Sequence, residues 1–224
     1  MEKFEQEKER EIYYAKIDFF TNVAHEIRTP LTLINGPLEN ILLKKTVDPE
    51  IREDLNIMKQ NTERLLSLTN QLLDFRKTES QGFRLNFAEC NVTEVLKETY
   101  NRFTSLARQR ELDFVLNVAE QDFYAHVNKE AFTKIVSNLL NNAVKYAETY
   151  VHVFLEMNGI GEKRMFYIRT VNDGVIIPNE MKEEIFKPFV RFNEKEDGKV
   201  TTGTGIGLAL SRSLAELHQG SLMM

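Results

Sequence analysis

A histidine and a glutamate stand side by side in the stretch FFTNVAHEIRTPLTLI, residues 19–34. Neutral imidazole is a nucleophile near neutral pH, and a neighbouring carboxylate can accept the proton of the other ring nitrogen. His25 and Thr29 are four residues apart, so a helix places both side chains on one face. Pro30 cannot donate a backbone hydrogen bond to the carbonyl of Glu26, which loosens that turn. The pattern favours nucleophilic chemistry at His25, although a histidine on a helix is more often a solvent-facing residue of structural use.

A pair of asparagines lies further along the chain, in the stretch NLLNNAVKY. Asn138 and Asn142 are four residues apart and share a helix face, and their amide oxygens suit Mg²⁺, which prefers oxygen ligands. Lys145 and Tyr146 follow directly in the same stretch. Asparagines on helices are usually surface or capping residues, so this spacing alone is weak evidence for a metal site.

A glycine-rich stretch, GTGIGLAL at residues 203–210, opens the last helix that the sequence predicts. Its glycines, Gly203, Gly205 and Gly207, let the backbone approach phosphates, and a helix N-terminus favours their negative charge. Taken alone, such a run could equally be a plain loop. Its position about sixty residues after the asparagine helix favours a phosphate site.

Two long helices must position the histidine. Apolar residues recur at steps of three or four from Phe20 to Ile41, and Asp48 and Pro49 then mark a break with an N-cap and a first helical residue. The second helix, to about Lys77, has a coiled-coil seam of Leu55, Met58, Thr62, Leu65, Thr69 and Leu72. Such helices form an antiparallel hairpin, and the width of the apolar stripe favours pairing with a second copy as a four-helix bundle. The alternative is a single helix pair packed on the rest of the chain.

The remaining residues alternate between strands and helices, which predicts a layered α/β domain. The expected elements are a strand at 83–87, a helix from the cap Asn91 to about Arg108, strands at 111–118 and 123–127, a helix at 129–146 capped by Asn128, a hairpin at 150–171 with turn residues Asn158, Gly159 and Gly161, a short helix after Pro178, and a helix at 206–218.

The stretch around His25 resembles the phosphoacceptor box of sensor histidine kinases nearly residue for residue. The resemblance implies that His25 is phosphorylated, that Glu26 is the acid–base group and that Thr29 serves phosphatase action. It also implies an α+β architecture in three parts. Residues 1–78 would be a dimerising phosphoacceptor hairpin that forms a four-helix bundle, 79–82 a linker, and 83–224 an α/β sandwich of the GHKL type that binds ATP.

Four segments resemble the nucleotide pocket of that family, and IFKPF at 185–189 resembles its phenylalanine box. The resemblance implies an ATP and Mg²⁺ site in which Asn142 is the metal ligand and residues 193–203 form a lid over the triphosphate. The residues implied to bind the nucleotide are Asn138, Asn142, Lys145, Tyr146, Asn172, Gly174, Lys187, Arg191, Gly203, Gly205, Gly207 and Leu208.

One segment departs from the family pattern Asp-x-Gly-x-Gly, in which the aspartate reads the adenine amino group. The chain has VNDGVIIP, so Asn172 takes the aspartate position, Gly174 is the first glycine, and Ile176 replaces the second. Asn172 still offers a carbonyl oxygen to that amino group but lacks the charge. We therefore expect ATP binding that is weaker than with the aspartate.

The motifs resemble, more narrowly, the core of bacterial hybrid two-component sensors of the Bacteroides type. This implies a homodimer, transfer to a receiver aspartate in the same polypeptide, an upstream membrane sensor, and a cytosolic location for this portion. The net charge of −5 and the single cysteine, Cys90, suggest no nucleic-acid surface and no internal disulfide, and no apolar run reaches the roughly 18 residues of a membrane span. The family normally continues past ELHQGSLMM with a further hairpin, so we expect an incomplete sheet.

Two other functions fit parts of the sequence. An ATPase of the wider fold family would hydrolyse nucleotide without using His25. A non-catalytic dimerisation and signalling module would fit the altered adenine segment and would bind no ATP.

Overall fold

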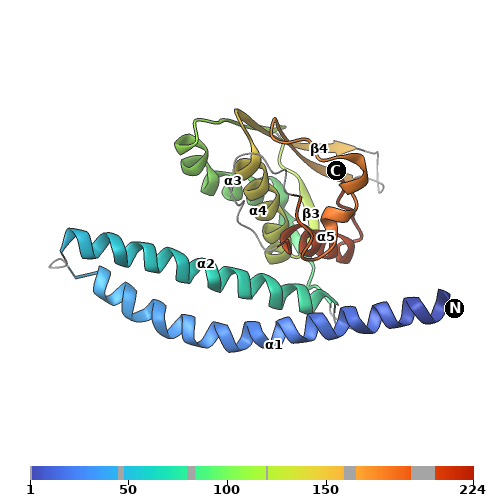
Figure 1. The fold of residues 1–224 in the computed structure, drawn as a ribbon. Helices are drawn as coiled ribbons and strands as arrows, with labels where there is room; N and C mark the ends of the chain where they lie inside the picture. Colours follow the sequence, from blue (N-terminus) through green and yellow to red (C-terminus); the bar gives the residue numbers. More distant parts are fainter. Residues whose placement is uncertain (1, 45–47, 80–83, 120, 159–164, 193–204) are drawn as a thin grey trace. The chain divides into compact units, whose positions relative to one another are not determined.

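The computed structural model describes residues 2–44, 48–79, 84–119, 121–158, 165–192 and 205–224 (Figure 1). The chain divides into two compact units, Met1–Phe83 and Arg84–Met224. No helix within the described ranges is both long and apolar enough to cross a membrane.

The first unit is a hairpin of two helices, α1 (Glu2–Leu42) and α2 (Pro49–Glu79), which run side by side in opposite directions (Figure 1). The predicted start of α2 is confirmed, since the Asp48 carboxylate accepts a hydrogen bond from the backbone N–H of Glu50 at 2.9 Å. Arg52 closes the connection by donating to the carbonyl oxygens of Leu42 at 2.9 Å and Lys44 at 2.7 Å.

The interface between the two helices follows a seven-residue repeat on α1. Its buried members are Ile17, Ala24, Leu31 and Leu38. On α2 the predicted seam is confirmed only in part: Thr62, Thr69 and Leu72 are buried, whereas Met58 and Leu65 are about half exposed. A single hairpin therefore leaves part of the apolar surface of α2 uncovered.

The second unit contains two small sheets. Strands β1 (Ala88–Asn91) and β3 (Tyr124–Val127) pair antiparallel. In the other sheet, β4 (Tyr150–Asn158) lies between a parallel neighbour, β2 (Asp113–Val118), and an antiparallel one, β5 (Met165–Asn172). The predicted hairpin at 150–171 is thus confirmed, while its turn residues Gly159 and Gly161 lie outside the described ranges.

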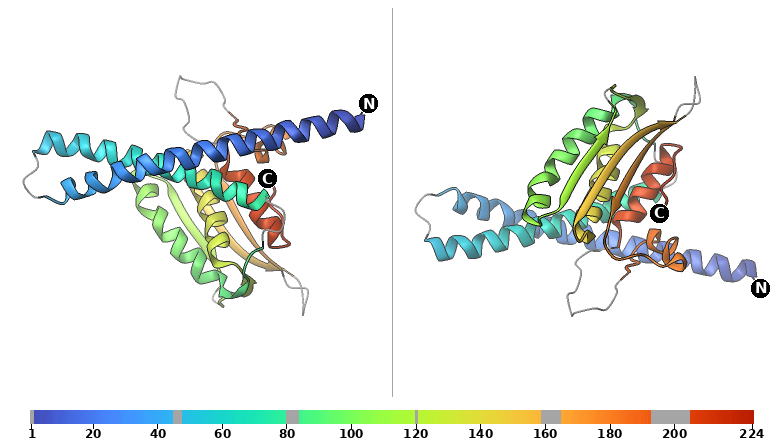
Figure 2. Two further views of the ribbon diagram at one scale, coloured as in Figure 1. Left: turned by 90° about the horizontal axis from the view of Figure 1, so that it is seen from below. Right: turned by 90° about the horizontal axis from the view of Figure 1, so that it is seen from above.

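Three helices lie on one side of the larger sheet (Figures 1 and 2). They are α3 (Val92–Gln109), α4 (Lys129–Tyr146) and α5 (Gly207–Leu217). The predicted caps are confirmed, because Asn91 accepts from the N–H of Glu94 at 3.1 Å and Asn128 from that of Ala131 at 2.9 Å. Two 3-10 turns, η2 (Asn179–Met181) and η3 (Glu184–Phe186), replace the single short helix expected after Pro178.

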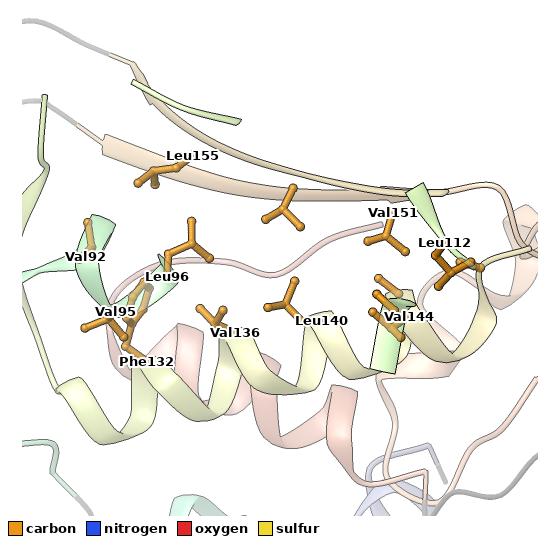
Figure 3. Close-up of a cluster of buried hydrophobic side chains, with 14 of the residues drawn as sticks. Val92, Val95, Leu96, Leu112, Phe132, Val136, Leu140, Val144, Val151 and Leu155 are labelled. Carbon is orange, nitrogen blue, oxygen red and sulfur yellow. The ribbon is translucent and has the colours of Figure 1, made fainter. Parts of the chain in front are cut away.

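The core of the second unit lies between α4 and the sheet (Figure 3). Val136, Leu140 and Val144 are spaced four apart along α4 and are at most 1% exposed. Alternate residues in the first part of β4 are also buried, namely Val151, Val153 and Leu155. The buried residues of α4 recur every four positions and pack on the alternate, buried residues of β4. The other residues of α4 therefore lie on the face that points away from the sheet.

The predicted strand at 83–87 is wrong, because β1 begins only at Ala88. Asn91 has to end the strand and cap α3 at once, and the ladder therefore pairs Ala88 with Val127 and Asn91 with Tyr124. Phe87, which suggested an alternating strand, instead packs edge-on against His218 with ring centroids 5.3 Å apart.

Candidate functional site

The first group of candidate residues lies on the solvent side of α1. His25, Glu26 and Thr29 are all exposed, because Ala24 and Leu31 occupy the face that packs against α2. Within the described residues the His25 side chain makes no hydrogen bond. The imidazole of His25 is therefore accessible from solvent.

A polar link between the helices lies one turn from the histidine. Arg28 donates a hydrogen bond to the side-chain oxygen of Asn70 on α2. The residues on either side of the Arg28 position in the sequence, Ile27 and Thr29, are exposed. The link therefore fixes the rotation of α1 about its axis where the reactive side chains project.

The two candidate asparagines of α4 have different environments. The side-chain amide of Asn138 donates to the carbonyl of Gly207 at 3.2 Å and to the hydroxyl of Ser211 at 3.1 Å, which ties α4 to α5. Asn142 is half-buried, and its side chain has no hydrogen-bond partner in the described part of the chain. Of the two, Asn142 keeps its whole amide group available to a ligand.

The last turn of α4 brings a cation and an aromatic ring together. The Lys145 ammonium lies 3.0 Å from the Tyr146 hydroxyl and 4.6 Å from the centre of that ring. Tyr146 is 40% exposed, so the ring keeps a face open to solvent. Such a pair can contact a phosphate and a flat base.

The end of β5 approaches that turn closely. A Cβ atom on Gly174 would lie 1.9 Å from the backbone oxygen of Tyr146, so only glycine fits there. Asn172 is the last residue of β5, and its side-chain nitrogen lies 3.0 Å from the same Cβ position. The structure thus brings Asn172 and Gly174 next to Tyr146.

The phenylalanine-box segment and the glycine-rich segment also meet. The N–H of Phe189 donates to the carbonyl of Gly205 at 2.9 Å, and both residues have left-handed backbone angles, with φ of 67° and 70°. A Cβ on Gly205 would lie 2.7 Å from the Val190 oxygen, so glycine is required. Lys187 forms an ion pair with Glu184 at 2.6 Å.

The remaining candidates fall at the edges of this region. Arg191 is exposed, and Gly207 and Leu208, both half-buried, open α5. Gly203 and the expected lid at 193–203 lie outside the described residues. Asn138 joins the two helices, so α4, the end of β5, residues 185–191 and the start of α5 surround one region of the second unit.

Two charged residues around this region are not among the predicted site residues. Arg110 donates to backbone carbonyls at the end of α4, and Asp173 accepts from backbone N–H groups just beyond it. Hydrogen bonds from Thr149, mainly from its hydroxyl, hold the pKa of Asp173 far below its usual range. No local sequence pattern marks Arg110, because its partners lie more than thirty residues away.

Two family models match the chain, one in each unit. The His Kinase A (phospho-acceptor) domain matches residues 15–81, and the histidine kinase-, DNA gyrase B- and HSP90-like ATPase domain matches residues 127–224. The chain belongs to the histidine kinases. Its fold is accordingly that of a kinase core, a helical hairpin followed by an α/β nucleotide-binding domain.

Relatives along the whole kinase core agree with this assignment. Histidine kinase P4 of Formosa agariphila is 32% identical over 226 residues, which are 100% of this chain and 16% of that protein. Hybrid signal transduction histidine kinase D of Dictyostelium discoideum is 32% identical over 222 residues, 96% of this chain and 14% of that protein. The kinase core thus spans about a sixth of the length of these relatives.

Solved structures share the fold of the kinase core. Full-length ShkA in complex with AMPPNP superposes with a TM-score of 0.71 at 23% identity, over 92% of this chain and 43% of that one. Histidine kinase ThkA in complex with the response regulator protein TrrA gives a TM-score of 0.56 at 26% identity, over 97% of this chain and 60% of that one.

Proposed function

We propose that this kinase core transfers the γ-phosphoryl group of ATP to His25. A ring nitrogen of His25 attacks the γ-phosphorus, the bond from phosphorus to the bridging oxygen breaks, and ADP leaves with the electron pair of that bond. The Glu26 carboxylate accepts the proton of the other ring nitrogen. The observation that carries the proposal is the exposed His25–Glu26 pair, in a chain whose second unit has contacts between four segments that resemble the nucleotide pocket of the family.

The nucleotide site extends from the end of β5 to the start of α5. Asn172 and Gly174 receive the adenine, with Tyr146 beside it, and the Asn172 carbonyl accepts from the adenine amino group. Lys145 faces the phosphates. The other phosphate contacts in the proposal are Asn138, Lys187, Arg191, Gly203, Gly205, Gly207 and Leu208.

Magnesium belongs to this proposal as a companion of ATP. The half-buried Asn142 amide, which has no hydrogen-bond partner within the described residues, fits an ion that takes neutral oxygen ligands. Asn138 fits less well, because its amide nitrogen already bonds α5. The bound ion would neutralise charge on the phosphates.

We assign the helical unit, residues 1–78, to dimerisation as well as phosphorylation, with 79–82 as linker and 83–224 as the ATP-binding domain. Exposed apolar residues repeat every seven positions along both helices, at Ile27, Ile34 and Ile41 on α1 and at Ile51, Met58 and Leu65 on α2. Such rows form a seam with a second copy.

Sedimentation of Leu65→Lys should give a monomer, whereas Leu33→Lys, beside the row and 70% exposed, should keep the dimer mass. A dimeric Leu65→Lys contradicts this seam.

The phosphoryl group of His25 passes in this proposal to an aspartate of a receiver domain, and Thr29 supports the reverse, phosphatase reaction. The ThkA complex with a response regulator and the hybrid relative from Dictyostelium support a receiver partner, which a hybrid protein carries in the same polypeptide. The kinase core would then act on the cytosolic side of an inner-membrane sensor.

Intact mass after incubation with Mg-ATP tests the reaction. The parent should gain one acid-labile phosphoryl group and His25→Ala none, while His126→Ala, which removes an exposed histidine of β3, should behave like the parent. ATP hydrolysis that persists in His25→Ala without phosphorylation of the parent would favour a plain ATPase. Absence of any ATP binding by the parent would favour a non-catalytic signalling module.

A further inference from the structure

The end of α4 is held by the arginine that directly follows α3. Arg110, directly after α3, donates from its guanidinium to the carbonyl oxygens of Val144, of Lys145 at 2.7 Å and of Ala147 at 3.2 Å. The last carbonyls of a helix have no partner within the helix, and a cation there also complements the helix dipole. Arg110 therefore holds two carbonyls in the last turn of α4 and a third on the residue that follows the helix.

An aspartate holds the chain that follows. Asp173 accepts from the backbone N–H groups of Glu148 at 3.0 Å, Thr149 at 3.0 Å and Tyr150 at 3.2 Å, and from the hydroxyl of Thr149. The backbone from 144 to 150 is thus bonded by a cation on its carbonyls and an anion on its N–H groups. One charge comes from the end of α3 and the other from the end of β5.

The segment between the two charges carries the side chains proposed to meet the nucleotide. Lys145 and Tyr146 project from it, and the Tyr146 carbonyl lies against Gly174 with no room for a Cβ atom. A shift of this turn would therefore move the ring of Tyr146 relative to Asn172. The same backbone hydrogen bonds therefore fix the positions of Tyr146 and Asn172, the two residues proposed to lie beside the adenine.

We infer that Arg110 is a positioning residue for the nucleotide, which holds Lys145 and Tyr146 in their binding geometry without touching the nucleotide itself. The inference rests on the proposed function of that site. Without Arg110 the end of α4 and Ala147 together lose three hydrogen bonds, and the side chains of Lys145 and Tyr146 must be ordered when the nucleotide binds. Ordering two side chains corresponds to a Kd higher by about tenfold.

The test is a calorimetric titration of the full chain with Mg-AMPPNP, alongside the rate of His25 phosphorylation at varied ATP. Arg110→Ala should raise Kd and the KM for ATP by about tenfold and leave kcat within about twofold. Arg110→Lys should lie between, because one ammonium group cannot reach three carbonyls. Arg108→Ala, which removes an exposed arginine from the last turn of α3, should match the parent.

Hydrogen exchange without nucleotide gives a second readout. Arg110→Ala should exchange faster in residues 144–150, while protection in β4 beyond that segment stays unchanged. If Arg110→Ala does not unfold cooperatively, and so is not properly folded, Arg110→Lys is used in its place. We expect the Kd of Arg110→Lys for Mg-AMPPNP to be about threefold higher than that of the parent.

Three results overturn the inference. A Kd within twofold of the parent in both variants removes the positioning role alone. A roughly tenfold fall of kcat in Arg110→Ala, with KM for ATP unchanged, would assign Arg110 to a step other than nucleotide binding. Failure of the parent itself to bind AMPPNP removes the proposed nucleotide site, and the role of Arg110 with it.

Discussion

Replacing Gly174 with alanine tests the close contact between β5 and α4. The new Cβ would lie 1.9 Å from the Tyr146 oxygen, and contacts below 3.0 Å do not persist, so the two backbones must separate by about 1.1 Å. Neither side moves freely, because Arg110 bonds the carbonyls on both sides of Tyr146 and Asp173 bonds the following N–H groups. Overpacking against side chains costs about 1–3 kcal/mol. Because the contact here is with a backbone that cannot move aside, we expect Gly174→Ala to lower the free energy of unfolding by about 3 kcal/mol, the upper end of that range.

Thermal and urea unfolding of the second unit measure this cost. A loss of about 3 kcal/mol lowers Tm by on the order of 10 °C in a domain of this size. Gly207→Ala is the matched control, since its Cβ would meet only the Asn138 side chain at 3.6 Å, and it should change stability by less than about 0.5 kcal/mol. Gly36→Ala in α1 meets nothing within 4 Å and should stabilise the hairpin by about 0.5–1 kcal/mol.

The steric reasoning fails if Gly174→Ala unfolds at the same urea concentration as the parent. It also fails if Gly174→Ala and Gly207→Ala lose equal stability, because the backbone contact would then make no difference.

Three further changes probe other contacts of the second unit. Asn138→Ala should lower the free energy of unfolding by about 1–3 kcal/mol in urea, because it leaves the buried hydroxyl of Ser211 without its donor. Asp173→Asn should be less stable than the parent at pH 7, and the difference should shrink below about pH 3.8. The pKa of the folded carboxyl is lowered, so its contribution is present above the unfolded-state pKa and is lost as pH falls; urea titrations at pH 7, 4 and 3 check this. His218→Ala should cost about 1–2 kcal/mol in the same assay, because the ring accepts from the N–H of Asn128 at 3.1 Å.

The elements that the sequence predicts well are those fixed by short-range chemistry. Asn91 and Asn128 each bond an N–H three residues away, so the starts of α3 and α4 can be read locally. Asp48 and Pro49 mark the start of α2 in the same way. The failed strand at 83–87 has the opposite cause, since Phe87 is retained by His218, a residue far along the chain.

The residues of the candidate site show the same difference between local and long-range contacts. The resemblance around His25 identifies the phosphoacceptor motif, and the structure places that residue on the exposed side of α1. The hydrogen bonds of Arg110 cannot be predicted from one sequence, because they join residues 34 to 37 positions apart. The same holds for Gly174, whose need for glycine comes from a carbonyl of α4 rather than from its own turn.

The parallel pairing of β2 with β4 has a consequence for the order of folding. Asp113 lies opposite Tyr150, so the two strands meet only when the chain between them, which includes β3 and α4, closes into a loop. Closing a segment of this length before any ladder forms is slow, whereas the helical hairpin pairs two helices that are adjacent in the sequence. Refolding should therefore show a fast phase from the first unit and a slower one from the second. On a ribosome, the unit that carries His25 would be folded before the unit that would phosphorylate it has formed.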